Sequence, residues 1–281
     1  MKILIISLLS LLLVSCGSGS GTTHTSLTVN VEPVINGAVY QPDVQATWQW
    51  QLLVRNGETL NTSYNVDIYD VDLFDTSVEQ INALQANGIN VICYFSAGSY
   101  EDWRLDASQF PDAALGNPLD EWEGERWLDI RLDAVHEIMA NRIEYALEQN
   151  CNGVEPDNMD GYQNNSGFDL SADDQLAFNR FIANTAHEYG LSVGLKNDLD
   201  QIEELVDYFD FAVNEQCFEY NECDLLLPFI DAGKPVLNAE YHENFLNEVN
   251  RVALCNDANA LQFSTLVLPL NLDDEFRYSC L

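Results

Sequence analysis

A segment in the middle of the chain carries three carboxylates, Glu155, Asp157 and Asp160, close together. The apolar residue before them predicts a buried strand, and the sequence Asp157-Asn-Met-Asp-Gly161 is typical of a turn. Carboxylates at the carboxyl end of a parallel strand lie where enzymes built on such sheets hold catalytic groups. For each acid taken alone, a helix cap or an Asx turn is the structural alternative. The whole set, with a further acid downstream, favours chemistry.

The further acid is Glu215, at the end of a strand predicted for Phe209–Glu215. If the strands are parallel, Asp157 and Glu215 face each other across one edge of the sheet. Cleavage of a glycosidic bond requires two carboxylates, because one protonates the leaving oxygen while the other attacks the anomeric carbon or activates water. The pair therefore predicts catalytic acids of a glycosidase.

Polar residues end nearly every predicted strand, and helix caps do not call for Lys or Glu. Lys196 would stay charged among carboxylates and orient them, with an ordinary ion pair as the alternative. Aromatic side chains near strand ends can stack on sugars or hold ammonium groups, whereas Trp50 and Tyr94 are interpreted as core. The predicted substrate-binding residues are Trp48, Tyr69, Asp70, Asp129, Glu155, Asp160, Tyr162, Lys196, Asn197, Glu240 and Tyr241.

Strands and helices alternate from Trp48 onward. Apolar periodicity predicts strands at 48–53, 66–70, 89–95, 127–130, 152–157, 191–196, 209–215 and 235–241, with 264–268 pairing at closure, and helices at 77–87, 133–148, 172–189, 198–206, 224–232 and 245–254. Eight strands, most followed by helices, predict an α/β fold, a (β/α)8 TIM barrel formed by residues 43–281 as a single domain. A doubly wound sheet is the alternative, but its GxGxxG fingerprint is absent. The long irregular segment 100–125 is expected to shape a cleft.

The N-terminal residues indicate export. Lys2 and the apolar run that follows predict a signal peptide over residues 1–15, too short to remain as a membrane span. The sequence Leu13-Val-Ser-Cys16 resembles a bacterial lipoprotein box, which makes Cys16 the lipidated first residue of the mature chain. Residues 16–42 are expected to form a flexible tether. We therefore predict an outer-membrane lipoprotein, at the cell surface or in the periplasm of a bacterium, that meets the membrane only through its lipid.

Six cysteines remain after Cys16, and an even number in an exported chain indicates disulfides, with fifteen possible pairings. Proximity in the sequence favours Cys217–Cys223 and Cys255–Cys280, which leaves Cys93–Cys151. No metal site and no cofactor are predicted, because there is no CxxC spacing, the histidines are scattered, and neither a P-loop nor an EF-hand occurs. A GxSxG elbow is also absent.

The chain is strongly acidic, with a formal net charge of −35 from 46 acidic and 11 basic residues. This field repels nucleic acid, which is therefore not an expected partner, and it concentrates a polycation. Adaptation to salt water produces similar acidic, lysine-poor surfaces. Charge alone thus does not identify the substrate.

Several short sequences occur in order along the chain: Cys93-Tyr-Phe-Ser-Ala-Gly-Ser99, Trp127-Leu-Asp-Ile-Arg131, Gly153-Val-Glu-Pro-Asp-Asn-Met-Asp-Gly-Tyr162, Gly194-Leu-Lys-Asn197 and Asn214-Glu-Gln-Cys217. Together they resemble glycoside hydrolase family 114, the endo-α-1,4-polygalactosaminidases, from about Trp48 to Tyr241. The resemblance implies a (β/α)8 barrel and hydrolysis of α-1,4-linked galactosamine in a cationic exopolysaccharide. The family's catalytic pair would fall on Asp157, as nucleophile, and Glu215, as acid/base.

Two rival functions are weighed against a lipid-anchored glycosidase acting on an amino-sugar polymer. One is a non-catalytic, carbohydrate-binding envelope lipoprotein that keeps the aromatic cleft, and the other is a purely structural envelope protein. The presence of both Asp157 and Glu215 favours the enzyme.

Overall fold

The computed structural model describes residues 27–55, 58–120 and 122–281. The signal peptide predicted for residues 1–15, Cys16 and the first part of the predicted tether lie outside these residues.

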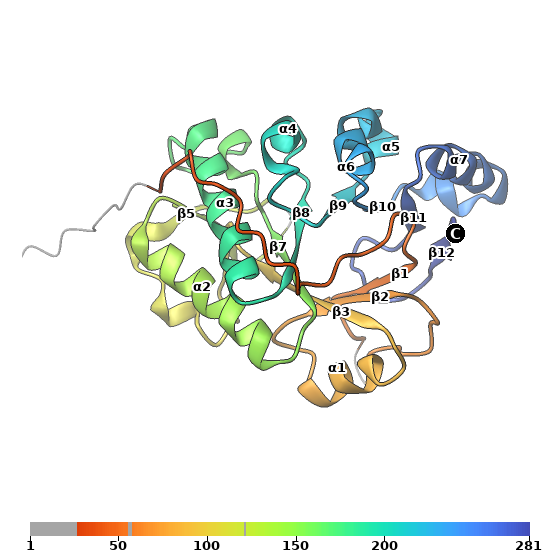
Figure 1. Cartoon of the computed structure of the whole chain (residues 1–281), viewed down its shortest axis with the longest axis horizontal. Helices are drawn as coiled ribbons and strands as arrows, with labels where there is room; N and C mark the ends of the chain where they lie inside the picture. Colours follow the sequence, from red (N-terminus) through yellow and green to blue (C-terminus); the bar gives the residue numbers. More distant parts are fainter. Residues whose placement is uncertain (1–26, 56–57, 121) are drawn as a thin grey trace, which may run out of the picture.

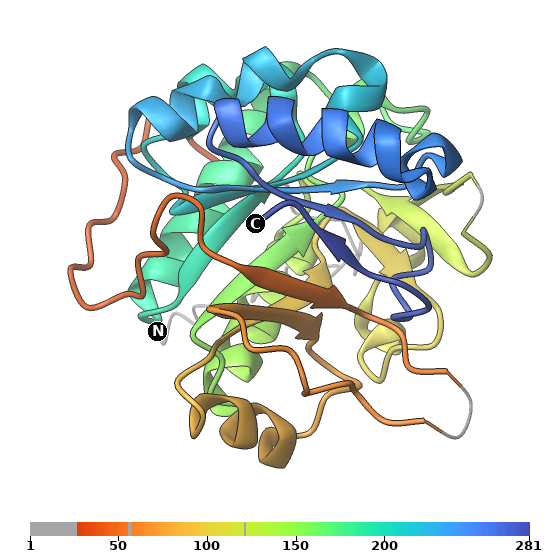
Figure 2. The same ribbon diagram turned by 90° about the vertical axis from the view of Figure 1, so that its right-hand side faces the viewer.

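A curled sheet forms the centre of the molecule (Figures 1 and 2). In the described part of the chain it has nine strands, of which neighbours pair in parallel except for the last, antiparallel one. Their order is β1 (Trp48–Gln51), β2 (Ile68–Asp72), β3 (Asn90–Ser96), β7 (Gly153–Asp157), β8 (Ser192–Lys196), β9 (Phe211–Glu215), β10 (Val236–Glu240), β11 (Ser264–Val267) and β12 (Tyr278–Ser279).

The first strand lies beside the last ones, as Figure 2 shows. The indole Nε1 of Trp48 donates to the Ser264 carbonyl at 2.7 Å, and Arg277 Nη2 donates to the Trp48 carbonyl at 2.6 Å. The sheet thus curls into a TIM-barrel-like fold, which confirms the predicted α/β architecture.

Helices cover the outside of the sheet (Figure 1). The longest one begins with a capping box: Ser171 precedes the helix that starts at Ala172, and its Oγ accepts from Asp174 N. The α-helices are α1 (Val78–Gln85), α2 (Asp133–Glu148), α3 (Ala172–Glu188), α4 (Ile202–Leu205), α5 (Cys217–Tyr220), α6 (Leu227–Asp231) and α7 (Glu248–Ala260), and the 3-10 turns are η1 (Ala107–Gln109), η2 (Asp112–Ala114), η3 (Gly161–Gln163), η4 (Leu199–Gln201), η5 (Cys223–Leu226) and η6 (Glu243–Leu246). Among the described residues, none of the helices combines the length and the apolar character that a membrane crossing needs.

The strand predicted at 127–130 does not belong to the barrel. Its residues form part of β6 (Glu125–Leu128), which pairs antiparallel with β4 (Ser99–Glu101) and β5 (Leu115–Pro118) in a separate small sheet. The place of the eighth parallel strand is taken by β11, which was expected only to pair at closure. A short apolar run predicts a strand but not its sheet, because periodicity carries no information on the pairing partner.

Part of the predicted tether is ordered. Residues 27–42 run along the outside of α3 (Figure 1), where Val34 N donates to Asn184 Oδ1 at 2.8 Å and Asn36 Nδ2 donates to the His187 carbonyl at 2.9 Å. Apolar side chains at every second position also pack on the core: Leu27, Val29 and Val31. The prediction of a flexible tether over residues 16–42 therefore does not hold for this part, because apolar burial offsets the entropy of ordering.

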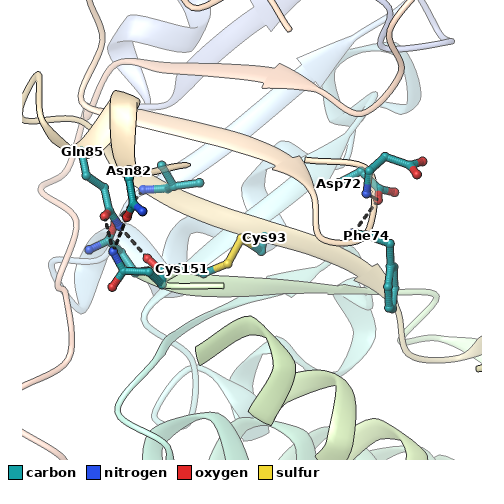
Figure 3. The surroundings of a disulfide bond; sticks show 10 residues. Asp72, Phe74, Asn82, Gln85, Cys93 and Cys151 are labelled. Atoms are coloured by element: carbon teal, nitrogen blue, oxygen red, sulfur yellow. Dashed lines mark hydrogen bonds between the residues drawn. A yellow bond between two sulfur atoms is a disulfide. The ribbon is translucent and has the colours of Figure 1, made fainter. Parts of the chain in front are cut away.

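All three favoured disulfides are present: Cys93–Cys151, Cys217–Cys223 and Cys255–Cys280. The first joins β3 to the residues that precede β7 (Figure 3). Beside it, Gln85 Nε2 of α1 donates to the Asn150 carbonyl at 2.6 Å. The strand that ends in Asp157 is thus tied covalently and by hydrogen bonds at its opposite end.

Candidate active site

A cavity of about 660 Å³ opens at the carboxyl ends of the parallel strands. Loops that follow β1, β2, β3, β7, β8, β9 and β11 contribute to its wall. Exposed indoles of Trp103 and Trp122, from the long loop after β3, stand at its edge. The expected cleft-forming role of segment 100–125 is thereby confirmed, and the aromatic walls suit sugar faces.

Asp157 ends β7 and is fixed by both its backbone and its side chain. Its carbonyl accepts from Ala97 N at 2.9 Å and Gly98 N at 3.0 Å, which join it to the loop after β3. Its Oδ1 accepts from Asn158 N at 2.7 Å, and its Oδ2 accepts from the Tyr94 hydroxyl at 3.2 Å. The carboxylate is therefore oriented while one edge faces the cavity.

Glu215 ends β9 and is held by neighbours on the adjacent strands. Asn197 Nδ2 donates to Glu215 Oε2 at 3.1 Å, and the Asn197 Oδ1 accepts from Glu215 N at 3.0 Å. The Tyr241 hydroxyl donates to Glu215 Oε1 at 2.6 Å. Burial, followed by the Glu215 charge, raises the pKa of Tyr241 well above its ordinary value, so this hydroxyl keeps its proton and remains a donor.

Backbone conformation helps to place these side chains. Directly after three neighbouring strands the chain enters the left-handed region, at Asn158 (φ 60°), Asn197 (φ 49°) and Gln216 (φ 63°). Asn adopts this conformation more readily than other residues with a side chain, whereas Gln does so at a cost. Such strained residues cluster at functional sites, and here all three line the cavity.

Lys196 lies between the two acids. Its Nζ is 2.9 Å from Asp157 Oδ1 and 3.2 Å from Glu215 Oε2, and 5.0 Å from the centre of the Trp50 ring. Burial lowers the pKa of Lys196, but Asp157, Glu215 and Glu155 more than offset this, so its pKa is raised well above the ordinary value. Because both oxygens lie about 3 Å from one nitrogen, they are at most about 6 Å apart.

Two further acids lie beneath Lys196. Asp70 and Glu155 are both 0% exposed, and Glu155 Oε1 is 3.5 Å from Lys196 Nζ. Burial raises the pKa of Asp70 well above its ordinary value, and burial together with the Asp70 charge does the same for Glu155. Burial therefore favours the protonated form of both acids. Neither acid reaches the cavity, so the expectation that they contact substrate directly is not met by the geometry.

The remaining predicted site residues divide into three groups. Asp160 lines the cavity, and burial and the Asp157 charge raise its pKa to about 6. Asn197 and Tyr241 support Glu215, as described. The others bond elsewhere and do not line the cavity: Trp48 (to Ser264), Tyr69 (to Asn61), Asp129 (to Arg131), Tyr162 (to Gln163) and Glu240 (to Phe218). Asp129 does not reach the cavity because the strand before it belongs to the small sheet. Tyr69 does not reach it because successive side chains of a strand point to opposite faces, and that of Tyr69 points outward.

Sequence reasoning missed several residues of the cleft. Trp50 and Tyr94 are buried, as the core interpretation predicted, but both also line the cavity, where Tyr94 contacts Asp157 and Trp50 contacts Lys196. Strand parity was the available signal, since Tyr94 is paired with Glu155, two residues before Asp157 on the same face. No sequence pattern indicated that Arg104 would line the cleft, because it lies in the irregular loop after β3. Its guanidinium forms an ion pair with Asp72 at 2.6 Å.

Comparisons with known proteins bear on the family and fold of the chain. The family model for glycoside-hydrolase family GH114 matches residues 31–281. The crystal structure of Aspergillus fumigatus Ega3 in complex with galactosamine is 40% identical, with a TM-score of 0.83 over 89% of this chain and 100% of that one. A search among curated protein sequences returns no match.

A more distant structure shares the fold. The glycoside hydrolase domain of PelA from Pseudomonas aeruginosa is 14% identical, with a TM-score of 0.63 over 82% of this chain and 96% of that domain. The family match extends over most of the chain and includes every residue of the cleft. The chain therefore belongs to glycoside hydrolase family GH114 and is a glycosidase.

Proposed function

We propose that this glycosidase cleaves α-1,4-galactosaminidic bonds within a cationic exopolysaccharide, with Asp157 as nucleophile and Glu215 as general acid/base. The observation that carries the proposal is the contact of both carboxylates with one ammonium, Lys196 Nζ, in one cleft. The 40% identity to a protein crystallised with galactosamine supports the amino-sugar part.

The separation of the acids favours retention of anomeric configuration. Retaining glycosidases place their carboxyl groups about 5 to 5.5 Å apart, whereas inverting ones need about 6.5 to 9.5 Å to admit a water. The shared contact with Lys196 keeps the nearer oxygens within about 6 Å of each other.

The reaction then proceeds in two displacements. Asp157 attacks the anomeric carbon as the bond to the leaving oxygen breaks, and Glu215 gives that oxygen its proton. Glu215 next takes a proton from water, whose oxygen displaces Asp157 from the sugar and restores both acids. Lys196 Nζ donates to Asp157 Oδ1 and so orients the nucleophile, and Asn197 and Tyr241 hold Glu215 in reach of the leaving oxygen.

The proposal is tested with Asp157→Asn and Glu215→Gln on deacetylated galactosaminogalactan, with released reducing ends as the readout. Each variant is expected to lower kcat by about a thousandfold, because each removes one of the reacting groups. Asp224→Asn and Glu248→Gln, exposed acids outside the cleft, serve as charge-matched controls and should keep full rates.

Two outcomes would contradict the proposal. A wild-type protein that binds the polymer but releases no reducing ends would favour the carbohydrate-binding alternative. A first-formed product with inverted configuration, observed by NMR before mutarotation, would reassign Asp157 as a general base.

We also propose that the protein is exported and anchored to the outer membrane through lipid on Cys16. The sequence Leu13-Val-Ser-Cys16 supports this, and the three disulfides fit an oxidising compartment. Wild-type protein expressed in a Gram-negative host should incorporate labelled palmitate and sediment with outer membranes. Cys16→Ser should do neither; equal labelling of both proteins would refute the anchor.

A further inference from the structure

A second cavity, of about 300 Å³, lies against the first. Its wall comes from the loops that follow β7, β8 and β9 and from the α5–η5 region. The two cavities share four wall residues: Asp160, Asn197, Glu215 and Gln216. The cleft therefore continues across the mouth of the barrel past Glu215. Of the residues used in the proposed chemistry, only Glu215 and its support Asn197 line this second cavity.

The chemistry of the second cavity differs from that of the first. The first has Lys196 and Arg104 in its wall, whereas the described residues lining the second include no Lys, Arg or His. Its acids are Asp160, Asp198, Asp200, Glu215 and Glu222, and its other polar side chains are the amides of Gln163, Asn197, Asn214 and Gln216 and the hydroxyl of Tyr220. The Tyr220 side chain is exposed, so its ring is available for stacking.

One of these acids, Asp198, is buried but has incomplete hydrogen bonding. Asp198 is 2% exposed, and its Oδ2 accepts from Asn179 Nδ2 at 2.8 Å. The Tyr162 hydroxyl also stabilises the carboxylate, but no donor among the described residues forms a well-aligned hydrogen bond with Oδ1. Burial and the nearby Asp160 raise the pKa of Asp198 to about 8. A buried carboxyl oxygen without a donor is costly, and a cationic or hydrogen-bonding ligand in the cavity would offset that cost.

From these observations we propose that the second cavity binds the positively charged amino-sugar residue on the leaving-group side of the bond that is cleaved. This inference rests on the proposed function for its direction along the polymer. Glu215, the acid that protonates the leaving oxygen, lines both cavities, while Asp157, the nucleophile, lines only the first. A sugar beyond Glu215 is therefore on the side of the departing oxygen, and its ammonium meets the carboxylates of Asp200 and Glu222.

The test uses two oligosaccharides of α-1,4-linked galactosamine that differ in one group. In one the leaving-group residue carries a free amine, and in the other this residue alone is N-acetylated. We compare wild type, Asp200→Asn/Glu222→Gln, and the control Glu203→Gln/Asp224→Asn, which removes the same charge from exposed acids that line neither cavity. Because Asp200 is exposed and Glu222 is only partly buried, the test variant should fold.

The test variant is expected to lower kcat/KM for the free-amine substrate by about fivefold, while that for the N-acetylated substrate changes less than about twofold. The control should leave the ratio of the two values at the wild-type level. Equal loss on both substrates, or no loss on either, would overturn the subsite.

Binding of a galactosamine trisaccharide, measured by calorimetry on the same proteins, separates this inference from the proposed function. If wild type cleaves neither substrate but the test variant alone binds more weakly, the subsite stands and the proposed hydrolysis fails. If the test variant and its control bind equally well, the subsite is refuted whatever the rates are.

Discussion

At the scale of single residues, the electrostatics of the cleft centre on Lys196. Its ammonium contacts Asp157 and Glu215, and Glu155 lies 3.5 Å below it. In a buried cluster each charge depends on the others, so removal of one cation leaves several acids without compensation. The apparent pKa values of such a cluster belong to the whole set rather than to one member.

Lys196→Met is therefore expected to lower kcat by about a hundredfold, because the loss of the cation removes the contact that orients Asp157 and frees the two acids to move apart. The acidic limb of the pH–rate profile should also move to higher pH, since the remaining carboxyls retain protons longer. Steady-state rates between pH 4 and 9 check both effects. A merely structural lysine would lower rates without moving the limb.

Lys234→Met provides the matched control. Lys234 is only partly buried, and its Nζ donates to the carbonyls of Val206 and Phe209, away from both cavities. Its removal should lower the free energy of unfolding while the folded protein keeps the wild-type pH–rate profile.

The proposed catalytic residues lie at strand ends, as the sequence predicted. Asp157, Glu215 and Lys196 each end a strand, and the parallel sheet brings such ends to one edge. Glu240 ends a strand too, yet it accepts from Phe218 N and caps a neighbouring segment. The sequence shows which polar residue ends a strand. Whether that side chain faces the cleft or hydrogen-bonds to a nearby backbone group depends on the path of the loops, which the sequence does not determine.

At the scale of elements, the loops after β3 and β7 are in direct contact, and Gly98 makes this possible. A Cβ at residue 98 would lie 1.8 Å from the Asn158 carbonyl oxygen, a distance that forces the loops apart. Gly98 N also donates to the Asp157 carbonyl. The position of the proposed nucleophile thus depends on a close approach of two backbones.

Gly98→Ala is expected to lower kcat by about a hundredfold, because a shift of roughly 1 Å in the nucleophile is enough for such a loss. The far-ultraviolet circular dichroism spectrum should remain that of wild type, since the barrel strands are not altered. Gly37→Ala is the control, as a Cβ there meets no atom within 4 Å. Wild-type rates in Gly98→Ala would mean that the loops adjust without moving Asp157.

Elements were predicted well where their periodicity is long and less well where it is short. Helices α2 and α3 lie where the apolar spacing indicated them. Segment 127–130 was assigned to the wrong sheet, because four apolar-rich residues pair equally well with a local antiparallel neighbour or with the barrel. The ordered packing of residues 27–42 was missed for a related reason. Their few apolar residues form no clear pattern in the sequence, and their burial depends on contacts with the rest of the fold.

At the scale of the whole molecule, the buried acids make stability depend on pH. The folded pKa is raised to about 6 for Asp160, about 7 for Glu125 and Glu240, and about 8 for Asp198, chiefly through burial. In the unfolded chain these groups titrate near 4. Between about pH 4 and pH 8 the native state therefore holds protons that the unfolded chain has released, and stability falls as pH rises through the folded values.

Urea unfolding should accordingly give a larger free energy of unfolding at pH 5 than at pH 9. Asp198→Asn should flatten this dependence, because it removes the acid with the highest pKa of the four while keeping an acceptor for Asn179. A stability that rises between pH 5 and pH 9 would contradict the raised pKa values.

The net charge of −35 leads to a prediction about salt. If the acidic surface attracts a polycation, kcat/KM for the deacetylated polymer should fall about tenfold between roughly 0.05 M and 0.5 M NaCl, because the screening length shortens to a few Å. A fully N-acetylated polymer, which carries no amine charge, should show little dependence if it is cleaved at all. Initial rates at low substrate concentration measure both. A flat response for the cationic polymer would mean that the acidity serves salt tolerance, and that short-range contacts such as those of Asp200 and Glu222 account for substrate choice by themselves.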